Sequence, residues 1–204
     1  MTLVLEKQSG VILSPTTKRW TVEEFVALQE QGALSGRYEL LEGMLNAKMG
    51  SGGRHALFVN MLMELLISLF GAGYVRVQQP LQIQGESGRY NRPEPDVAVS
   101  RQHHRTYRDH PLPEDLLLVA EVSDSSLLYD LTAKASLYAQ TGVAEYWVLD
   151  IEGQSLLVHR EPTAEGYQQV LTLKVGDTLA PLSLPNASFP LVELLESEQT
   201  EESA

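Results

Sequence analysis

The feature that most limits how this chain can fold is the uninterrupted apolar run LLLVAEV at residues 116–122. A strand with one face in water alternates apolar and polar residues, whereas a continuous run of this length is typical of a strand covered on both faces. Such a strand needs other elements packed above and below it. We therefore expect a sheet with helices packed on it and this run as one of its buried strands.

The segments before and after this run predict the other elements of an α/β chain. Residues 55–70 and 126–140 carry apolar residues at helical spacing, and each predicts a helix. Thr21, with Glu24 three residues later, has the pattern of a capping box at the start of a short helix. Strands are predicted at residues 37–45 (a hairpin arm that turns at Glu42 and Gly43), 74–83, 95–100, 145–150 and 155–160. This order predicts an α/β sheet flanked by helices, with a β-rich C-terminal extension.

The composition is that of a soluble globular chain. Its 204 residues suit one domain with a substantial core. It has no cysteine, which excludes disulfides and thiolate metal sites and makes the cytoplasm the simplest compartment. The longest apolar stretch, LLISLFGAG, is too short to span a bilayer, and the N-terminus lacks the pattern of a signal peptide. We expect a single domain at residues 20–195, a flexible segment at residues 1–19, an acidic disordered tail at residues 196–204 and no membrane partner.

The charge of the chain gives conflicting indications about nucleic acid. The formal net charge of −12 argues against it, because basic surfaces normally drive phosphate binding. Part of that charge lies in the acidic tail, however, and residues 89–108 concentrate five arginines and two histidines. This basic segment could contact phosphates or could be an exposed, solubilising loop, and the sequence leaves both open.

Glu121 stands at the end of the apolar run, where an ionised carboxylate would lose its water. A charge buried without a partner costs roughly several kcal/mol, so Glu121 there requires a cationic partner, a metal ion or a raised pKa. The alternative is that the strand emerges into solvent at Glu121 and that the following SDSS begins a loop.

Lys134 is the second residue that the pattern singles out. On a helix over residues 126–140 it falls on the apolar stripe of leucines rather than on the solvated face. Buried lysines are rare unless paired, and a helix directly after the Glu121 strand would bring Lys134 back over the end of that strand. Two alternatives remain: a side chain that snorkels along the core, or an i,i+4 pair with Asp130.

Two further residues are candidates for a site. Asp96, in NRPEPDVAVS, is either a polar residue that only marks the start of a strand or a carboxylate held at the edge of the sheet for chemistry. His55 begins the predicted helix on its apolar stripe. A histidine there is more often a core or capping residue, although it could also reach a site or a phosphate at the helix N-terminus.

Together, Asp96, Glu121 and Lys134 indicate metal-dependent phosphoryl chemistry. Two carboxylates from neighbouring strand ends supply the hard oxygen ligands that Mg²⁺ requires. The metal lowers the pKa of a bound water, and a nearby ammonium stabilises charge that develops in the transition state. Other chemistries fit less well, because the chain has no P-loop, no G-x-S-x-G and no H-E-x-x-H.

The sequence also resembles a known family. The run EVSDSSLLYDLTAKASLYAQTGVAEYWVLD is similar to the hallmark segment of the Uma-two family, bacterial proteins described as restriction endonucleases or by a domain of unknown function. The similarity extends through TVEEFVAL, RYELLEGML, PEPDVAVS and the closing GDTLAPLSLPNASFPLVELL, over roughly residues 20–195. The resemblance implies the fold of the PD-(D/E)XK nuclease superfamily, a mixed sheet flanked by helices.

The resemblance assigns roles to individual residues. It implies that Pro95-Asp96 and Glu121 are the acidic positions of the motif and that the carbonyl of Val122 is a further metal ligand. The lysine that the superfamily places two residues after the second acid is Ser123 in this chain. Lys134 matches the lysine that the family carries on the following helix.

The resemblance further implies a Mg²⁺-dependent endonuclease acting on DNA, with Mn²⁺ as a possible substitute. His55 and Glu42 would support the site, although Glu42 is equally well explained as a hairpin-turn residue. Asp124 either reaches the metal or caps the next helix. Three alternatives stay open: hydrolysis of another phosphoester, a non-catalytic module of the same fold that binds nucleic acid or protein, and a homodimer.

Overall fold

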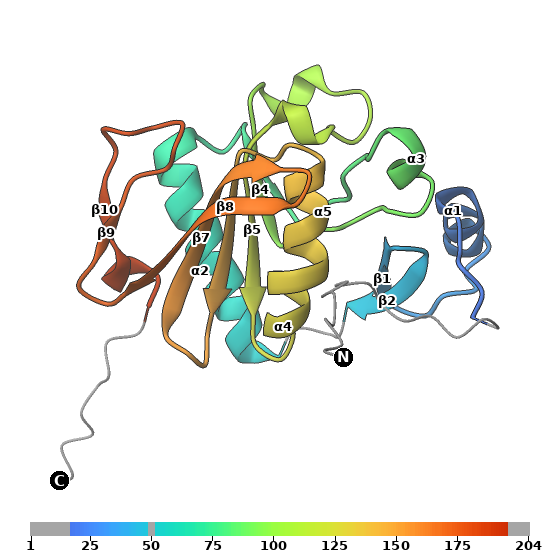
Figure 1. Ribbon diagram of the computed structural model, residues 1–204, viewed down its shortest axis with the longest axis horizontal. Helices are drawn as coiled ribbons and strands as arrows, with labels where there is room; N and C mark the ends of the chain where they lie inside the picture. Colours follow the sequence, from blue (N-terminus) through green and yellow to red (C-terminus); the bar gives the residue numbers. More distant parts are fainter. Residues whose placement is uncertain (1–16, 49–51, 196–204) are drawn as a thin grey trace, which may run out of the picture.

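The centre of the molecule is a six-stranded mixed sheet (Figure 1). The computed structural model describes residues 17–48 and 52–195, so the predicted tail and most of the predicted N-terminal segment lie outside the described residues. Neighbouring strands are antiparallel except for β5 and β6, which are parallel. In spatial order the strands are β3 (Val75–Val77), β4 (Val97–Ser100), β5 (Leu116–Ser123), β6 (Glu145–Asp150), β7 (Ser155–Thr163) and β8 (Gly166–Lys174).

β5 is the buried strand that the apolar run predicts, and every residue in it except Leu117 is buried. Two parallel neighbours require a crossover connection, which the chain makes with one helical segment between β5 and β6. This segment consists of α4 (Leu127–Tyr129), a π-helical turn η3 (Asp130–Lys134) and α5 (Ala135–Gln140). The helix predicted at residues 126–140 is therefore present, with a π turn inside it.

Alternate residues of β5 face opposite sides of the sheet. Leu118 and Val122 join a large aliphatic core with α2 (Gly53–Phe70). Val119 joins a smaller core on the side of α5, and Glu121, two residues on, lies on that side as well. The two helices thus cover opposite faces of the sheet (Figure 1).

The β-rich C-terminal extension is also present. β7 and β8 form a long hairpin at one edge of the sheet. The chain then continues into β9 (Thr178–Leu179), β10 (Phe189–Pro190) and the short helix η4 (Leu191–Glu193). Leu179, Phe189 and Leu191 are buried in the same aliphatic core as α2, so this segment closes that side of the sheet.

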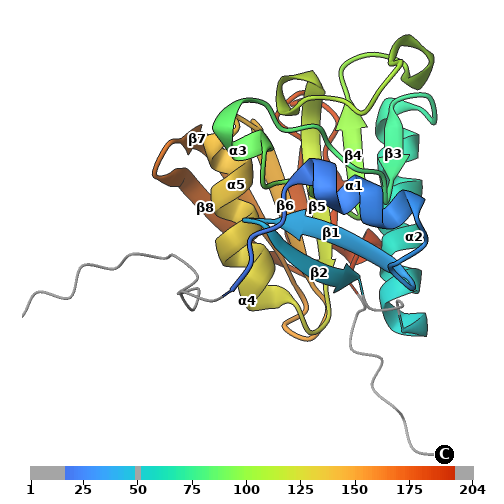
Figure 2. The ribbon, with the colours of Figure 1, turned by 90° about the vertical axis from the view of Figure 1, so that its right-hand side faces the viewer.

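The N-terminal part crosses the opposite side of the sheet (Figure 2). It consists of α1 (Val22–Glu30) and a hairpin of β1 (Arg37–Leu41) and β2 (Met44–Lys48). Both hydrogen bonds of the predicted capping box between Thr21 and Glu24 are made. The hairpin turns at Glu42 and Gly43, whose φ angles of 52° and 78° are the two positive values that a tight two-residue hairpin turn needs.

One predicted strand is much shorter than expected. Of residues 74–83 only those of β3 pair with a neighbouring strand. Gln78 has a φ of 50°, which ends the extended conformation, and Pro80 has no N–H to donate to a ladder. The chain beyond it forms loops and the short helical turns α3 (Gly85–Gly88), η1 (His104–Thr106) and η2 (Pro113–Asp115).

By length and composition alone, α2 could cross a membrane. Its buried residues Phe58, Leu62 and Leu66, however, pack against the sheet. Packing in the core accounts for the apolar sequence of this helix.

Candidate active site

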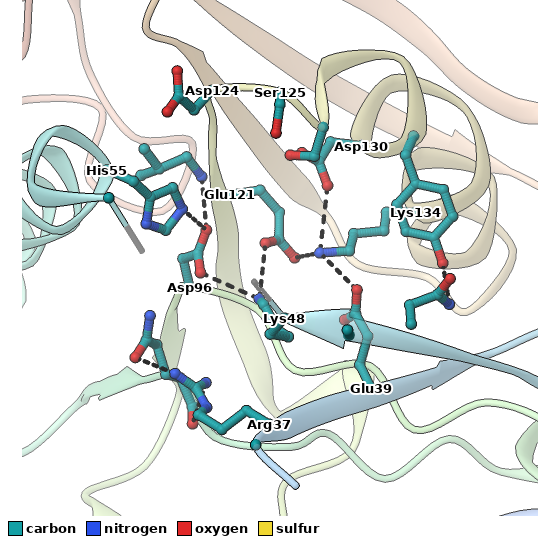
Figure 3. Close-up of a pocket in the computed structure, with 18 of the residues that line it drawn as sticks. Arg37, Glu39, Lys48, His55, Asp96, Glu121, Asp124, Ser125, Asp130 and Lys134 are labelled. Atoms are coloured by element: carbon teal, nitrogen blue, oxygen red, sulfur yellow. Dashed lines mark hydrogen bonds and ion pairs between the residues drawn. The ribbon is translucent and has the colours of Figure 1, made fainter. Parts of the chain in front are cut away.

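A cleft of about 800 Å³ opens at the edge of the sheet where β4 begins and β5 ends (Figure 3). The β1–β2 hairpin, the N-terminus of α2 and residues of α4 and η3 line it. Because β4 and β5 are antiparallel, with Val97 opposite Ala120, Asp96 and Glu121 come from the start of one strand and the end of its neighbour. The register therefore brings the two acids into the same cleft.

A single ammonium group lies between these two carboxylates. Lys48 Nζ is 3.2 Å from Oδ1 of Asp96 and 3.8 Å from Oε2 of Glu121, and it donates a hydrogen bond of 2.6 Å to the carbonyl oxygen of Glu94. Lys48 is the last residue of β2, and its side chain is 15% exposed. Sequence reasoning missed Lys48, because no periodicity distinguishes a lysine at the end of a hairpin arm from a solvated one.

Lys134 lies deeper, on the other side of Glu121. Its Nζ is 2.9 Å from Oε1 of Glu121, 3.2 Å from Oε1 of Glu39 and 3.3 Å from Oδ1 of Asp130, and its side chain is only 4% exposed. Burial disfavours its charge, but the three carboxylates hold the pKa of Lys134 well above its usual range. Lys134 therefore faces inward over the end of the Glu121 strand and also forms the i,i+4 pair with Asp130. The sequence suggests these two arrangements as alternatives, and the structure has both.

The π turn η3 begins at Asp130 and ends at Lys134. π turns are rare inside α-helices and are often found at functional sites. The other oxygen of Asp130 accepts hydrogen bonds from the hydroxyls of Ser123 (2.7 Å) and Ser126 (2.5 Å). Ser123, which stands where the superfamily pattern has a lysine, thus helps to fix the acid that pairs with Lys134.

Glu121 is 1% exposed and is held from two sides. Beside its contact with Lys134, its Oε1 accepts a hydrogen bond of 3.2 Å from the hydroxyl of Tyr138. Burial raises the pKa of Glu121 to about 8; the two lysines oppose this rise and the nearby acids add to it. Burial thus makes Glu121 the acid of the pair that holds a proton more readily than Asp96 does.

Asp96 has the opposite character. Its Oδ2 accepts a hydrogen bond of 3.0 Å from the backbone N–H of Val122 and lies 3.4 Å from Nε2 of His55. Burial favours the protonated acid, but the bond to His55, the charges of Lys48 and Lys134 and the N–H of Val122 hold the pKa of Asp96 well below its usual range. Asp96 is thus an ionised carboxylate fixed in one orientation.

His55 lies in the first turn of α2 and lines the cleft. The hydrogen bond to Asp96 raises its pKa, against the effect of burial, and the backbone of Val122 adds to the rise. Val122 lines the cleft, and its backbone N–H donates to Asp96. His55, Asp96, Glu121, Val122 and Lys134 all come together, as the sequence predicts.

Glu42 does not join them. It is exposed in the turn of the hairpin, where its positive φ and its backbone bonds to Arg19 and Asn91 belong to the turn itself. The acid that the hairpin contributes is Glu39, which is 4% exposed, contacts Lys134 and accepts a hydrogen bond from the N–H of Glu94 at 3.1 Å. The predicted turn at Glu42 and Gly43 was itself a signal, because it leaves Glu39 as the acid inside the strand.

Asp124 and the basic segment are placed away from the ion pairs. Asp124 is exposed at the rim with its carboxylate directed away from them (Figure 3), and the N-cap position of α4 is Ser126, not Asp124. Residues 101–108 follow the C-terminal end of β4, whereas Asp96 precedes its N-terminal end, so the two lie at opposite ends of this strand. None of the five arginines of the basic segment lines the cleft; the arginine that does is Arg37.

Comparison with known proteins gives both a family and a fold. The model of the Uma2 family, described as "Putative restriction endonuclease", matches residues 22–192. A crystal structure from Anabaena variabilis ATCC 29413, described as a "putative nuclease belonging to DUF820", matches with a TM-score of 0.66 at 14% sequence identity, over 85% of this chain and 96% of that chain. No curated protein matches this chain.

At 14% identity the structural likeness shows a shared fold, a mixed sheet flanked by helices. The family match covers most of the chain and includes the strands and helices that build the cleft. This chain belongs to the Uma2 family, and its fold is nuclease-like.

Proposed function

We propose that this protein is a metal-dependent endonuclease that hydrolyses phosphodiester bonds in DNA. The observation that carries the proposal is the pair of carboxylates, Asp96 and Glu121, that face one cation position from adjacent strands. In the structure the ammonium of Lys48 takes that position. A buried pair of acids arranged around a cation is the arrangement that a divalent metal site needs.

The donor chemistry of the cleft fits Mg²⁺ or Mn²⁺. Asp96, Glu121 and the carbonyl of Val122 offer only oxygen atoms, which are the ligands of hard cations. Among residues 17–48 and 52–195 there is no ready-made group of three acid or histidine side chains for a metal ion. Mg²⁺ does not need one, because it usually keeps several waters and binds through one or two carboxylates. When bound, such an ion supplies Lewis-acid polarisation of a phosphoryl oxygen and activation of water.

The residues of the chain have distinct tasks in this proposal. Asp96 is held ionised and oriented by His55 and by the N–H of Val122. Glu121 is kept in place by Lys134 and Tyr138 and loses its proton when a cation binds.

The N-terminus of α2 offers a place for a phosphate beside these acids. It carries no acidic residue in its first turn, and its N-cap, Gly52, makes no side-chain capping bond. The free N–H groups at such a helix end favour an anion. Since the basic segment lies elsewhere, we expect Arg37 and Lys48 to supply the cationic contacts to DNA at the cleft.

The test is nicking of a supercoiled plasmid in Mg²⁺ or Mn²⁺, with EDTA as the metal-free reference. We expect cleavage by the wild type and at least about a 100-fold loss in Asp96→Asn, because a metal ligand contributes several kcal/mol to the transition state. Glu165→Gln, an exposed residue at the turn of the β7–β8 hairpin, removes the same charge and should cleave normally. Undiminished cleavage by Asp96→Asn would show that the metal site lies elsewhere.

A second function is favoured by one observation. Each of the buried acids Glu39, Asp96, Glu121 and Asp130 already contacts Lys48 or Lys134, so every acid of the cluster has a cationic partner without a metal ion. This arrangement suits a non-catalytic module that keeps the fold for binding a partner. Absence of cleavage together with an unfolding temperature that Mg²⁺ leaves unchanged would favour this module over the enzyme.

A further inference from the structure

The two lysines of the cleft have the same number of polar contacts but different surroundings. Lys134 Nζ contacts three carboxylates and is almost fully buried. Lys48 Nζ contacts two carboxylates and the carbonyl of Glu94, and its side chain is more exposed. Lys48 also comes from a two-stranded hairpin, whereas Lys134 is fixed in the helical crossover that covers the sheet.

We infer that Lys48, rather than Lys134, is the ammonium that acts on the substrate, and that it reaches the substrate by giving up the cation position between Asp96 and Glu121. This inference rests on the proposed function, because it assigns a residue of the same site. Lys134 is then a positioning residue, which acts through Glu121.

The contacts of Lys134 leave it no freedom to serve a phosphate. All three of its acceptors are buried acids that come from separate elements, β1, β5 and η3. Turning the ammonium toward a substrate would break all three contacts and would leave Glu39 and Asp130 buried without their cation. Lys134 therefore holds Glu39, Glu121 and Asp130 together.

Lys48 is in the reverse situation. Its Nζ lies 3.2 Å from Asp96 and 3.8 Å from Glu121, whereas Mg²⁺ binds its ligands at about 2.1 Å. An ammonium and a divalent cation cannot share so small a space, because like charges a few Å apart repel strongly. A bound ion would therefore displace the Lys48 ammonium from between the two carboxylates, and the carbonyl of Glu94 would remain available to hold it in the cleft, where it could serve a phosphate.

The consequence is a pair of opposite effects that a purely structural lysine would not produce. Removing the charge of Lys48 should strengthen metal binding, because the competing cation is gone, and should weaken cleavage, because the phosphate loses its ammonium. We expect Lys48→Gln to bind Mn²⁺ at least about tenfold more tightly than the wild type and to nick plasmid at least about tenfold more slowly at saturating metal. Lys48→Arg keeps the charge and should bind Mn²⁺ like the wild type.

The experiment combines Mn²⁺ titration of the substrate-free protein, followed by electron paramagnetic resonance, with plasmid nicking. The control is Lys174→Gln, an exposed residue of β8 three strands away from β5, which should alter neither quantity. Tighter Mn²⁺ binding with slower nicking supports the inference. Unchanged affinity and rate in Lys48→Gln overturn it while the nuclease proposal stands.

Two other outcomes separate the inference from the proposed function. If the wild type nicks nothing but Lys48→Gln binds Mn²⁺ more tightly, Lys48 does occupy the cation position and the nuclease proposal fails. If neither the wild type nor Lys48→Gln binds Mn²⁺, both are overturned. Loss of nicking in Lys48→Gln with weaker Mn²⁺ binding also overturns the inference, because Lys48 would then support the metal site rather than compete with it.

Discussion

The two faces of the central sheet are built from the same strands but have opposite chemistry. On the face covered by α2 and the C-terminal segment, the buried residues form one continuous core of aliphatic and aromatic side chains. On the face covered by α5 and the β1–β2 hairpin, the core is smaller and merges into a buried set of acids and lysines. β5 supplies both, since Val122 faces the first side and Glu121 the second.

The difference shows how the protein can keep charges inside its fold. A buried ion pair contributes little or nothing net to stability, because desolvation offsets its attraction, although removing one partner alone is strongly destabilising. The α2 face, where burial of apolar surface contributes about 25 cal/mol per Å², must therefore provide most of the stability. The α5 face can then hold buried acids and lysines that add little to stability but can take part in binding or catalysis. The comparison predicts that substitutions on the two faces differ in what they change.

The largest effect is expected from Lys134→Met on the α5 face. This change leaves Glu39 and Asp130 buried without their cation, so we expect the free energy of unfolding to fall by about 4 kcal/mol. Chemical denaturation at neutral pH measures it, with Lys174→Met of β8 as the exposed control. A loss below about 1 kcal/mol would mean that water reaches these acids, and the charged face would not be buried as the structure shows.

Leu62→Ala on the α2 face should come next. Leu62 is fully buried in the aliphatic core, and truncation of such a leucine costs about 3 kcal/mol through lost burial and the cavity that remains. Unlike a change in the cleft, it should leave the affinity for Mn²⁺ unaltered at a temperature where the protein stays folded. A parallel loss of metal affinity would show that the two faces do not act independently.

The same division explains which features the sequence could predict. The apolar run of β5 and the leucine stripe that carries Lys134 are local periodic patterns, and both the buried strand and the inward lysine follow from them. Asp96 could be placed because neighbouring antiparallel strands bring a strand start beside a strand end. These predictions depend only on contacts that the sheet itself dictates.

Lys48 and Glu39 could not be placed in this way. They come from a hairpin whose docking over the sheet is a tertiary contact. The turn at Glu42 and Gly43 places Glu39 inside a strand, but the sequence of the hairpin does not show which surface it packs against.

The position of the basic segment has a related explanation. Arg101 is only five residues from Asp96, but β4 is extended between them, so the two residues lie at opposite ends of the strand. Nearness in sequence is a poor guide to a site that lies at one end of a strand.

The smallest effect concerns pH and isolates Glu121 within the charged face. Its pKa is raised to about 8, from an ordinary value of 4.5, so the folded state binds a proton that the unfolded state has already lost. The stability that this contributes is complete below pH 4.5 and is lost as the pH rises through 8. Glu121→Gln imitates the protonated acid and cannot titrate. Between pH 6 and 7 the free energy of unfolding of the wild type should therefore fall by about 1 kcal/mol relative to this variant, because one pKa unit corresponds to at most about 1.4 kcal/mol. Urea unfolding of both proteins across this range, with Glu165→Gln as the exposed control, measures the difference. Parallel pH profiles would mean that Lys134 keeps Glu121 ionised, so that the buried acids of this face carry their full charge before any metal ion binds.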